Sequence, residues 1–109
     1  MKILHIEIHV NTKADFKVKE INIEKETDKQ YKVAGGRGVV NKSKLLEAST
    51  IFRNSVGGQK ATVNYTCYCL LEDEKKAKDL LFNKAKQRIN DLNIGTLNLI
   101  NALSEFNYR

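Results

Sequence analysis

The residues best suited to chemistry are a glycine-rich segment that contains one arginine, Gly35-Gly36-Arg37-Gly38. Successive glycines let a loop turn its N–H groups toward a ligand and let that ligand approach the main chain closely. Arg37 adds a planar group that donates paired hydrogen bonds to a phosphate. Lys42 follows at the expected start of a short helix, whose positive end attracts anions. We therefore expect Gly36, Arg37, Gly38 and Lys42 to form a phosphate site, with a plain surface turn as the alternative.

This glycine segment matches neither of two common nucleotide-binding motifs. A P-loop ends in Gly-Lys followed by Ser or Thr, and a dinucleotide-binding loop has the spacing G-x-G-x-x-G. Both patterns are absent from the sequence. A second glycine segment, Gly57-Gly58-Gln59-Lys60, carries a single lysine and is more typical of a hairpin turn.

Tyr65 and Tyr68 offer a surface on which a base can stack. They lie three residues apart in a strand-like segment, so they project from opposite faces. At most one of them can then face a ligand while the other packs in the core. Arg88 lies next to the apolar seam of the C-terminal helix, where it would point into a groove between copies of the chain or into solvent.

Catalytic and metal-binding patterns are weak. His5 and His9 share a strand face but lie about 13 Å apart, which is too far for one metal ion. Cys67 and Cys69 lie in the middle of a strand-like segment, without the basic neighbour that makes a reactive thiolate, so we expect inert buried thiols. The acidic run 72–74 is explained by the start of a helix. We expect no catalytic residues, no metal and no cofactor.

The N-terminal part has the pattern of β-structure. Residues 2–10 alternate, which predicts a half-buried strand whose apolar face carries Leu4, Ile6, Ile8 and Val10. The next apolar positions change parity between Val18 and Ile21, so we expect a bulge near Lys19-Glu20. Residues 61–71 contain few polar residues on either face and are expected to form a central strand.

Helices are expected after these strands. Asn41 is a suitable cap for a short helix that begins at Lys42. Apolar residues then recur every three or four positions from Ala77 to Phe106, which is the helical period. One helix of that length would measure roughly 50 Å, in a domain of about 35 Å. We expect either a break at Asn93-Ile94-Gly95, with Thr96 as a cap, or packing against another copy. The wider apolar face beyond the glycine favours self-association.

Composition limits the class of protein. The chain has 109 residues, which indicates one domain at 1–109, with 1–71 mainly β-sheet and 72–109 a helical segment for oligomerisation. The expected fold is α+β, with a small antiparallel sheet of three to five strands, a short helix, and a long amphipathic C-terminal helix or helix pair.

The net charge of +6 favours an anionic partner. No apolar run approaches a membrane span, and no leader sequence is seen, so we expect a cytoplasmic protein.

The layout of short motifs resembles that of a known family. A hairpin, a third strand leading to Gly-Gly-Arg-Gly, an Asn-Lys-Ser helix start, and a strand running into Leu-Leu-Glu-Asp-Glu and a lysine-rich helix are similar to small phage proteins of the Thoeris anti-defence family. The resemblance implies a sheet with C-terminal helices and assembly into dimers or hexamers. It also implies a "sponge" that holds cyclic ADP-ribose isomers or cyclic oligonucleotides between protomers without cleaving them.

The expected function is therefore non-enzymatic. The protein would sequester a cyclic nucleotide immune signal in the cytoplasm of the host cell and so inhibit antiphage defence. The expected ligand-binding residues are Gly36, Arg37, Gly38, Lys42, Tyr65, Tyr68 and Arg88. Two alternatives remain open: a basic nucleic-acid-binding or host-takeover protein, and an inhibitor that docks on a host enzyme through its C-terminal apolar face.

Overall fold

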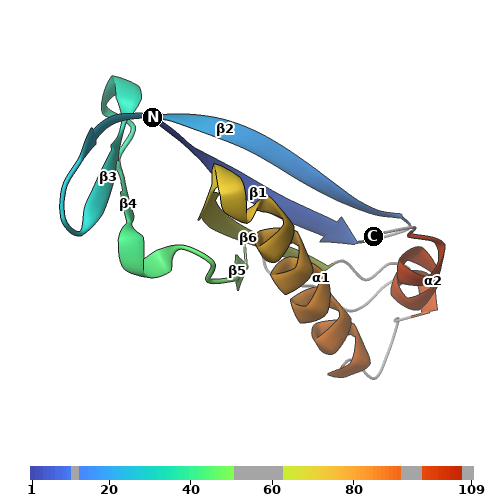
Figure 1. Cartoon of the computed structure of the whole chain (residues 1–109). Helices are drawn as coiled ribbons and strands as arrows, with labels where there is room; N and C mark the ends of the chain where they lie inside the picture. Colours follow the sequence, from blue (N-terminus) through green and yellow to red (C-terminus); the bar gives the residue numbers. More distant parts are fainter. Residues whose placement is uncertain (11–12, 51–62, 92–96, 107–109) are drawn as a thin grey trace.

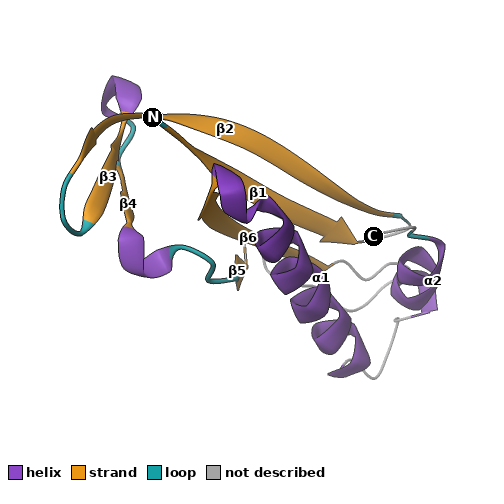
Figure 2. Ribbon diagram, viewed as in Figure 1, coloured by secondary structure: helices purple, strands orange, loops and turns teal. Residues whose placement is uncertain are grey.

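The computed structural model describes residues 1–10, 13–50, 63–91 and 97–106, and these form one antiparallel sheet with two helices (Figures 1 and 2). Five strands have three or more residues, and a sixth, β5, has two. The α+β class is confirmed. The strands are β1 (Lys2–Val10), β2 (Ala14–Glu26), β3 (Gln30–Val33), β4 (Val39–Asn41), β5 (Ser49–Thr50) and β6 (Val63–Leu70), in the spatial order β4-β3-β2-β1-β6-β5. The helices are α1 (Glu74–Asp91) and α2 (Leu97–Glu105), with single 3-10 turns η1 (Ala34–Gly36), η2 (Lys42–Lys44) and η3 (Leu71–Asp73).

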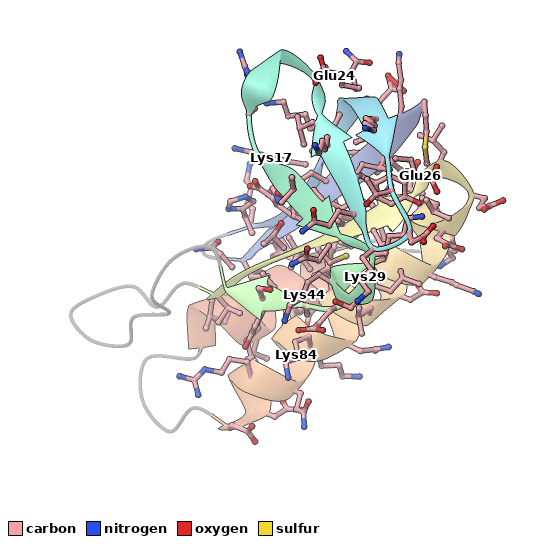
Figure 3. The ribbon with its side chains drawn as sticks, turned by 90° about the vertical axis from the view of Figure 1, so that its left-hand side faces the viewer. Lys17, Glu24, Glu26, Lys29, Lys44 and Lys84 are labelled. Atoms are coloured by element: carbon pink, nitrogen blue, oxygen red, sulfur yellow. The ribbon has the colours of Figure 1, made fainter. Side chains whose placement is uncertain are left out.

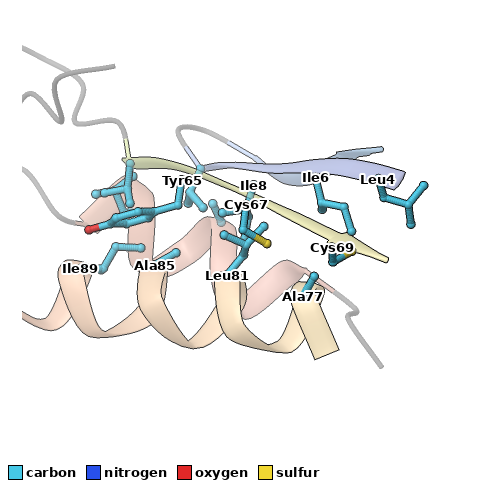
Figure 4. Close-up of a cluster of buried hydrophobic side chains, with 14 residues drawn as sticks. Leu4, Ile6, Ile8, Tyr65, Cys67, Cys69, Ala77, Leu81, Ala85 and Ile89 are labelled. Atoms are coloured by element: carbon cyan, nitrogen blue, oxygen red, sulfur yellow. The ribbon is translucent and has the colours of Figure 1, made fainter. Parts of the chain in front are cut away.

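The main core lies between α1 and one face of β1 and β6 (Figure 4). Every second residue of these strands is buried there, as the alternation predicts. The helix contributes a residue every four positions, so a single stripe of α1 faces the sheet. The buried side chains of this stripe are Ala77, Leu81, Ala85 and Ile89. Two of the four are alanines, which lets the helix axis approach the strands closely.

A second, smaller core lies on the opposite face of the sheet, and it explains an error in the expected register. β1 pairs with β2 without interruption from Lys2 opposite Asn22 to Val10 opposite Ala14, so the bulge predicted at Lys19-Glu20 is wrong. Val18 pairs with Ile6 on the α1 face, whereas Ile21 pairs with Ile3 on the other face. The second core is built on Ile3, Tyr31 and Val40. The parity change therefore marks a switch of the buried face, and the register shift occurs further on, between Ile23 and Lys25 opposite β3.

The short helix predicted after Asn41 is also wrong, because only the single turn η2 forms. Leu45 returns to an extended backbone and Leu46 has a positive φ of 57°. The Asn41 side chain does not cap the turn, and its Oδ1 accepts a hydrogen bond from Gln30 Nε2 at 2.9 Å. Leu45 packs against the second core and Leu46 against the main core. Neighbouring residues that pack on opposite faces of a sheet cannot both lie on one buried stripe of a helix, and this overrides the helical pattern.

The C-terminal segment is a helix pair, which was the first of the two expected arrangements. α2 packs against the main core of its own chain, where Leu99 and Ala102 are buried, while Ile100 is 47% exposed. Leu99 and Leu103 of the wide apolar face are therefore covered without a second copy. The expected cap Thr96 and the second glycine segment, 57–60, lie outside the described residues. Within the described ranges, neither helix is long and apolar enough to cross a membrane.

Candidate ligand-binding groove

A groove of about 560 Å³ lies on the face of the sheet opposite α1, between β2 and the turn that joins β3 to β4. Its volume falls within the range of small-molecule sites. The strands and the turn contribute both charged and apolar groups to its wall. The lining residues are Lys19, Glu20, Ile21 and Asn22 from β2, Val33, Ala34, Gly35 and Arg37 from the end of β3 and the turn, and Tyr68 from β6.

The glycine-rich segment forms the turn of the β3–β4 hairpin. The Val33 N–H donates a hydrogen bond to the Gly38 carbonyl at 3.0 Å, which closes the turn. Gly35 and Gly38 have φ values of 78° and 107°, a region that favours glycine because it has no Cβ. The turn contacts β2 and brings Gly35 and the exposed Arg37 to the groove. Gly36 and Gly38 belong to the same turn but are not part of the groove lining.

The two tyrosines of β6 lie on opposite faces, as their spacing predicts. Tyr65 is 6% exposed and packs in the main core (Figure 4). Tyr68 lines the groove and is half-buried against the second core. Its main chain is also fixed, because the Leu46 N–H donates a hydrogen bond to the Tyr68 carbonyl at 2.8 Å. Tyr68, and not Tyr65, is therefore the aromatic residue that a ligand in the groove can contact.

Lys42 and Arg88 lie away from the groove of a single chain. The Lys42 Nζ lies 2.6 Å from Glu26 Oε2 and 5.1 Å from the centroid of the Tyr31 ring. The hydrogen bond to Glu26 raises the pKa of Lys42. Lys42 thus has local partners at the far end of the β2–β3 hairpin. Arg88 is on α1, which packs against the face of β6 opposite to Tyr68.

A row of three residues across neighbouring strands extends the groove, and the sequence alone did not indicate it. His5 of β1 is directly opposite Lys19 of β2 on one side and Tyr68 of β6 on the other. The ring centroids of His5 and Tyr68 are 4.7 Å apart, with an angle of 37° between the planes. The alternation of β1 places His5 on the face away from α1, but only the register of three strands places it beside Tyr68.

His5 belongs to a chain of hydrogen-bonding groups. Its Nε2 is hydrogen-bonded to Thr66 Oγ1, and the Thr66 hydroxyl is also within donating distance, 3.1 Å, of the Ile6 carbonyl. On its other side, His5 Nδ1 lies 3.6 Å from Glu7 Oε2. The second oxygen of Glu7, Oε1, lies 2.7 Å from His9 Nε2. Four side chains on one face of the sheet are thereby linked.

The environment of His5 disfavours its charged form. The side chain is 20% exposed, and burial lowers the pKa of His5 below its ordinary value of 6.5. The Glu7 carboxylate opposes this shift, and the Lys19 ammonium reinforces it. His5 is therefore mainly neutral at neutral pH, which is the form that can act as a base or accept a hydrogen bond.

The order hydroxyl, imidazole and carboxylate also occurs in nucleophilic catalysis. Here the hydroxyl of Thr66 lies in the middle of a strand and has a main-chain carbonyl as a second partner. We interpret the chain of groups as a structural network that supports Tyr68.

The cysteines are free and buried, as the strand pattern predicts. Burial raises the pKa of Cys67 to about 12 and that of Cys69 to about 11. Thiols with such values carry almost no thiolate at neutral pH. Among the described residues, no three histidine, cysteine, aspartate or glutamate side chains are grouped so that they could hold a metal ion.

The groove brings Arg37 and Tyr68 together on the face of the sheet away from α1. Comparison with known proteins adds no further assignment. No protein-family model, curated protein or solved structure matches this chain. The similarity to anti-defence sponges therefore rests on the sequence layout.

Proposed function

We propose that this protein binds a small anionic nucleotide in the groove and lowers its free concentration without changing it chemically. The observation that carries the proposal is the presence of Arg37 and Tyr68 in the lining of one groove, although they come from different parts of the chain. Both residues were predicted from the sequence as ligand-binding residues because of their side-chain chemistry. An arginine and an aromatic ring are the usual groups that hold a phosphate and a base.

The groups of the groove divide between the two parts of such a ligand. Tyr68 offers a ring for stacking, a contact worth roughly 1–3 kcal/mol per base in proteins that bind single strands. Arg37 and Lys19 provide positive charge for the phosphate, and both are exposed at the groove. Glu20 and Asn22 provide polar groups for a sugar hydroxyl or a base edge. The mixed lining favours a nucleotide over a bare phosphate.

The identity of the ligand is the part of the proposal that rests on the resemblance alone. We propose a cyclic ADP-ribose isomer or a cyclic oligonucleotide, bound by a phage protein that inhibits antiphage defence in the host cytoplasm. Assembly into dimers or hexamers belongs to the same proposal. In such an assembly, we propose that Arg88 of a second copy completes the site, because α1 lies on the side of the sheet away from the groove in its own chain.

Binding and ligand recovery test the proposal together. The purified protein is titrated with cyclic ADP-ribose isomers and cyclic dinucleotides in a calorimeter, and the bound ligand is released by heat and examined by mass spectrometry. We expect one defined stoichiometry and an unchanged ligand. Arg37→Gln should weaken binding about tenfold or more, as expected for loss of a charge-assisted hydrogen bond. A chemically altered product would contradict sequestration.

A matched substitution locates the site. Lys84 is exposed on α1, on the opposite side of the sheet, so Lys84→Gln removes one positive charge without touching the groove. Binding by this control should equal that of the unmodified protein. Arg88→Gln should also have no effect if one chain forms the whole site, whereas a loss as large as that of Arg37→Gln indicates a site between copies. Equal losses for Arg37→Gln and Lys84→Gln would place binding outside the groove.

Nucleic-acid binding remains the alternative that the net charge of +6 allows. Figure 3 labels four exposed lysines: Lys17 on β2, Lys29 in the turn before β3, Lys44 in η2 and Lys84 on α1. Proteins that hold nucleic acid without sequence preference use a positively charged groove that follows the backbone. Binding to DNA or RNA that weakens steeply with salt would favour this alternative over the groove.

A further inference from the structure

His5 lies beside Tyr68 on the neighbouring strand, outside the set of residues that line the groove. In the hydrogen-bond network around His5, two acceptors compete for one hydroxyl hydrogen. The Thr66 hydroxyl has one hydrogen and two neighbouring acceptors, the Ile6 carbonyl and the Nε2 of neutral His5. Only one of them can receive it at a time.

Each protonation state of His5 selects one arrangement. When His5 is neutral, the Glu7 carboxylate 3.6 Å from Nδ1 favours the tautomer with its hydrogen on Nδ1, and Nε2 then accepts the hydrogen of Thr66. When His5 is protonated, Nε2–H donates to Thr66 Oγ1, and the Thr66 hydroxyl turns its hydrogen to the Ile6 carbonyl. Nδ1–H faces Glu7 in both states. The site thus accommodates both states by rotation of one hydroxyl, with no movement of the rings.

We propose that His5 is a positioning residue of the groove that supports the Tyr68 ring and, on protonation, adds positive charge that tightens the binding of an anionic nucleotide. This inference rests on the proposed function of the groove. Through Tyr68, His5 influences the ligand without contacting it. The sign of the effect follows from charge: an anion held beside Lys19 and Arg37 is attracted more strongly when His5 also carries a proton.

The charged groups around His5 determine how readily it is protonated. Glu7 and, through it, His9 lie on the same strand, Lys19 and Lys17 are on β2, and Tyr68 is on β6. Without ligand, burial and Lys19 oppose protonation more than Glu7 favours it. A bound phosphate near Lys19 offsets the repulsion from that lysine. Linkage is reciprocal, so an anion that binds better to protonated His5 raises the pKa of His5 in return.

The test begins with the ligand-free protein. The midpoint of the His5 titration is measured by NMR on the ring carbon-bound hydrogens, which are assigned with His5→Gln. The Tyr68 ring signals are followed in the same samples. We expect the Tyr68 signals to move at the His5 midpoint, and to lose this movement in His5→Gln. If the Tyr68 ring signals do not shift as His5 titrates, the inference is overturned.

Binding of cyclic ADP-ribose is then measured by calorimetry one pH unit above and one below that midpoint. We expect about fivefold tighter binding at the lower pH, at the lower end of usual site-to-site coupling. His5→Gln should bind equally at both values. Lys84→Gln is the control, because Lys84 is exposed on α1, on the opposite side of the sheet, and lies outside the network of His5. It should keep the pH dependence.

The outcomes separate the two proposals. Nucleotide binding that is equal at both pH values in the unmodified protein refutes the role of His5 and leaves the groove as the binding site. A complete absence of binding to cyclic ADP-ribose and to cyclic dinucleotides at either pH refutes the proposed function, and this inference with it. Should His5→Gln fail to fold, the His5 signals are assigned by elimination with His9→Gln, since the chain has two histidines. The His5 midpoint of the unmodified protein is then compared with and without nucleotide: an upward shift supports the inference, and an unchanged midpoint contradicts it.

Discussion

The ring of His5 lies 4.7 Å from the ring of Tyr68, centroid to centroid, and this contact joins strand β1 to a groove formed mainly by β2 and the β3–β4 turn. It gives Tyr68 a second support besides the second core. A residue held from two sides presents a preorganised surface to a ligand, which lowers the ordering cost of binding.

The first prediction concerns that surface. Tyr68→Leu should weaken nucleotide binding about tenfold, because a base loses an aromatic partner worth roughly 1–3 kcal/mol. Tyr68→Phe should retain most of the affinity, since it keeps the ring. Calorimetric titration with cyclic ADP-ribose measures both, and thermal denaturation checks that the variants fold. A Tyr68→Leu variant with unchanged affinity would show that no base stacks on this residue.

Sequence alternation was sufficient to predict which residues of β1 form the main core, and for β6 it separated the two faces without indicating which of them packs against the helix. A period of two together with one buried face leaves only one way to orient a strand. The same rule gave the wrong register for β2, because a change of parity has two physical origins: an inserted residue, or a strand that serves a different core at each end. β2 is an example of the second origin, because Phe16 packs against the main core and Ile21 against the second core.

The groove could be predicted only in part. Arg37 and Tyr68 carry recognisable chemistry, so their residue types were sufficient to select them. The row formed by Lys19, His5 and Tyr68 depends on the register of three strands, and β6 begins at Val63, far along the chain from the end of β1 at Val10. Lys42 and Arg88 were equally plausible by type, but folding gave Lys42 a local partner, Glu26, and placed Arg88 on the opposite side of the sheet.

The second prediction is a pH dependence of stability that originates at His5. Burial lowers the pKa of His5 in the folded protein, so the unfolded chain binds a proton more readily below its ordinary pKa of 6.5. The stability contributed by neutral His5 is therefore complete above pH 6.5 and is lost as the pH falls through the folded pKa. Urea unfolding at several pH values should show this loss in the unmodified protein and a smaller loss in His5→Gln. An identical pH dependence in the two proteins would contradict it.

The third prediction concerns the turn that carries Arg37. Gly38 has a φ of 107°, which an L-residue adopts only with strain, so Gly38→Ala should destabilise the hairpin by roughly 1–3 kcal/mol. Space is not the cause, since a methyl group at this position would meet no atom within 4 Å beyond its chain neighbours. Val39→Ala is the control, because Val39 is the next residue and is 50% exposed. It should change the free energy of unfolding much less. Both values come from urea denaturation.

The fourth prediction is chemical. Cys67 and Cys69 have pKa values of about 12 and 11 because of burial, so almost no thiolate is present at pH 8. The native protein should react with a thiol reagent far more slowly than a free cysteine, and both thiols should react rapidly once the chain is unfolded in urea. Absorbance of the released reagent group follows both reactions. Rapid reaction of the native protein would mean that β6 separates from α1 readily.

The fifth prediction tests whether α2 belongs to the core of its own chain. Leu99 is fully buried against the main core, whereas its neighbour Ile100 is 47% exposed. Leu99→Ala should lower the free energy of unfolding by roughly 2–5 kcal/mol, the usual cost of such a cavity, and Ile100→Ala by much less.

Native mass spectrometry of the same two variants tests self-association separately. If copies assemble through α2, Ile100→Ala should reduce the oligomer at unchanged stability of the fold, because its side chain then packs against the partner copy. An oligomer that survives this substitution, or a monomer in the unmodified protein, would show that α2 serves its own chain alone.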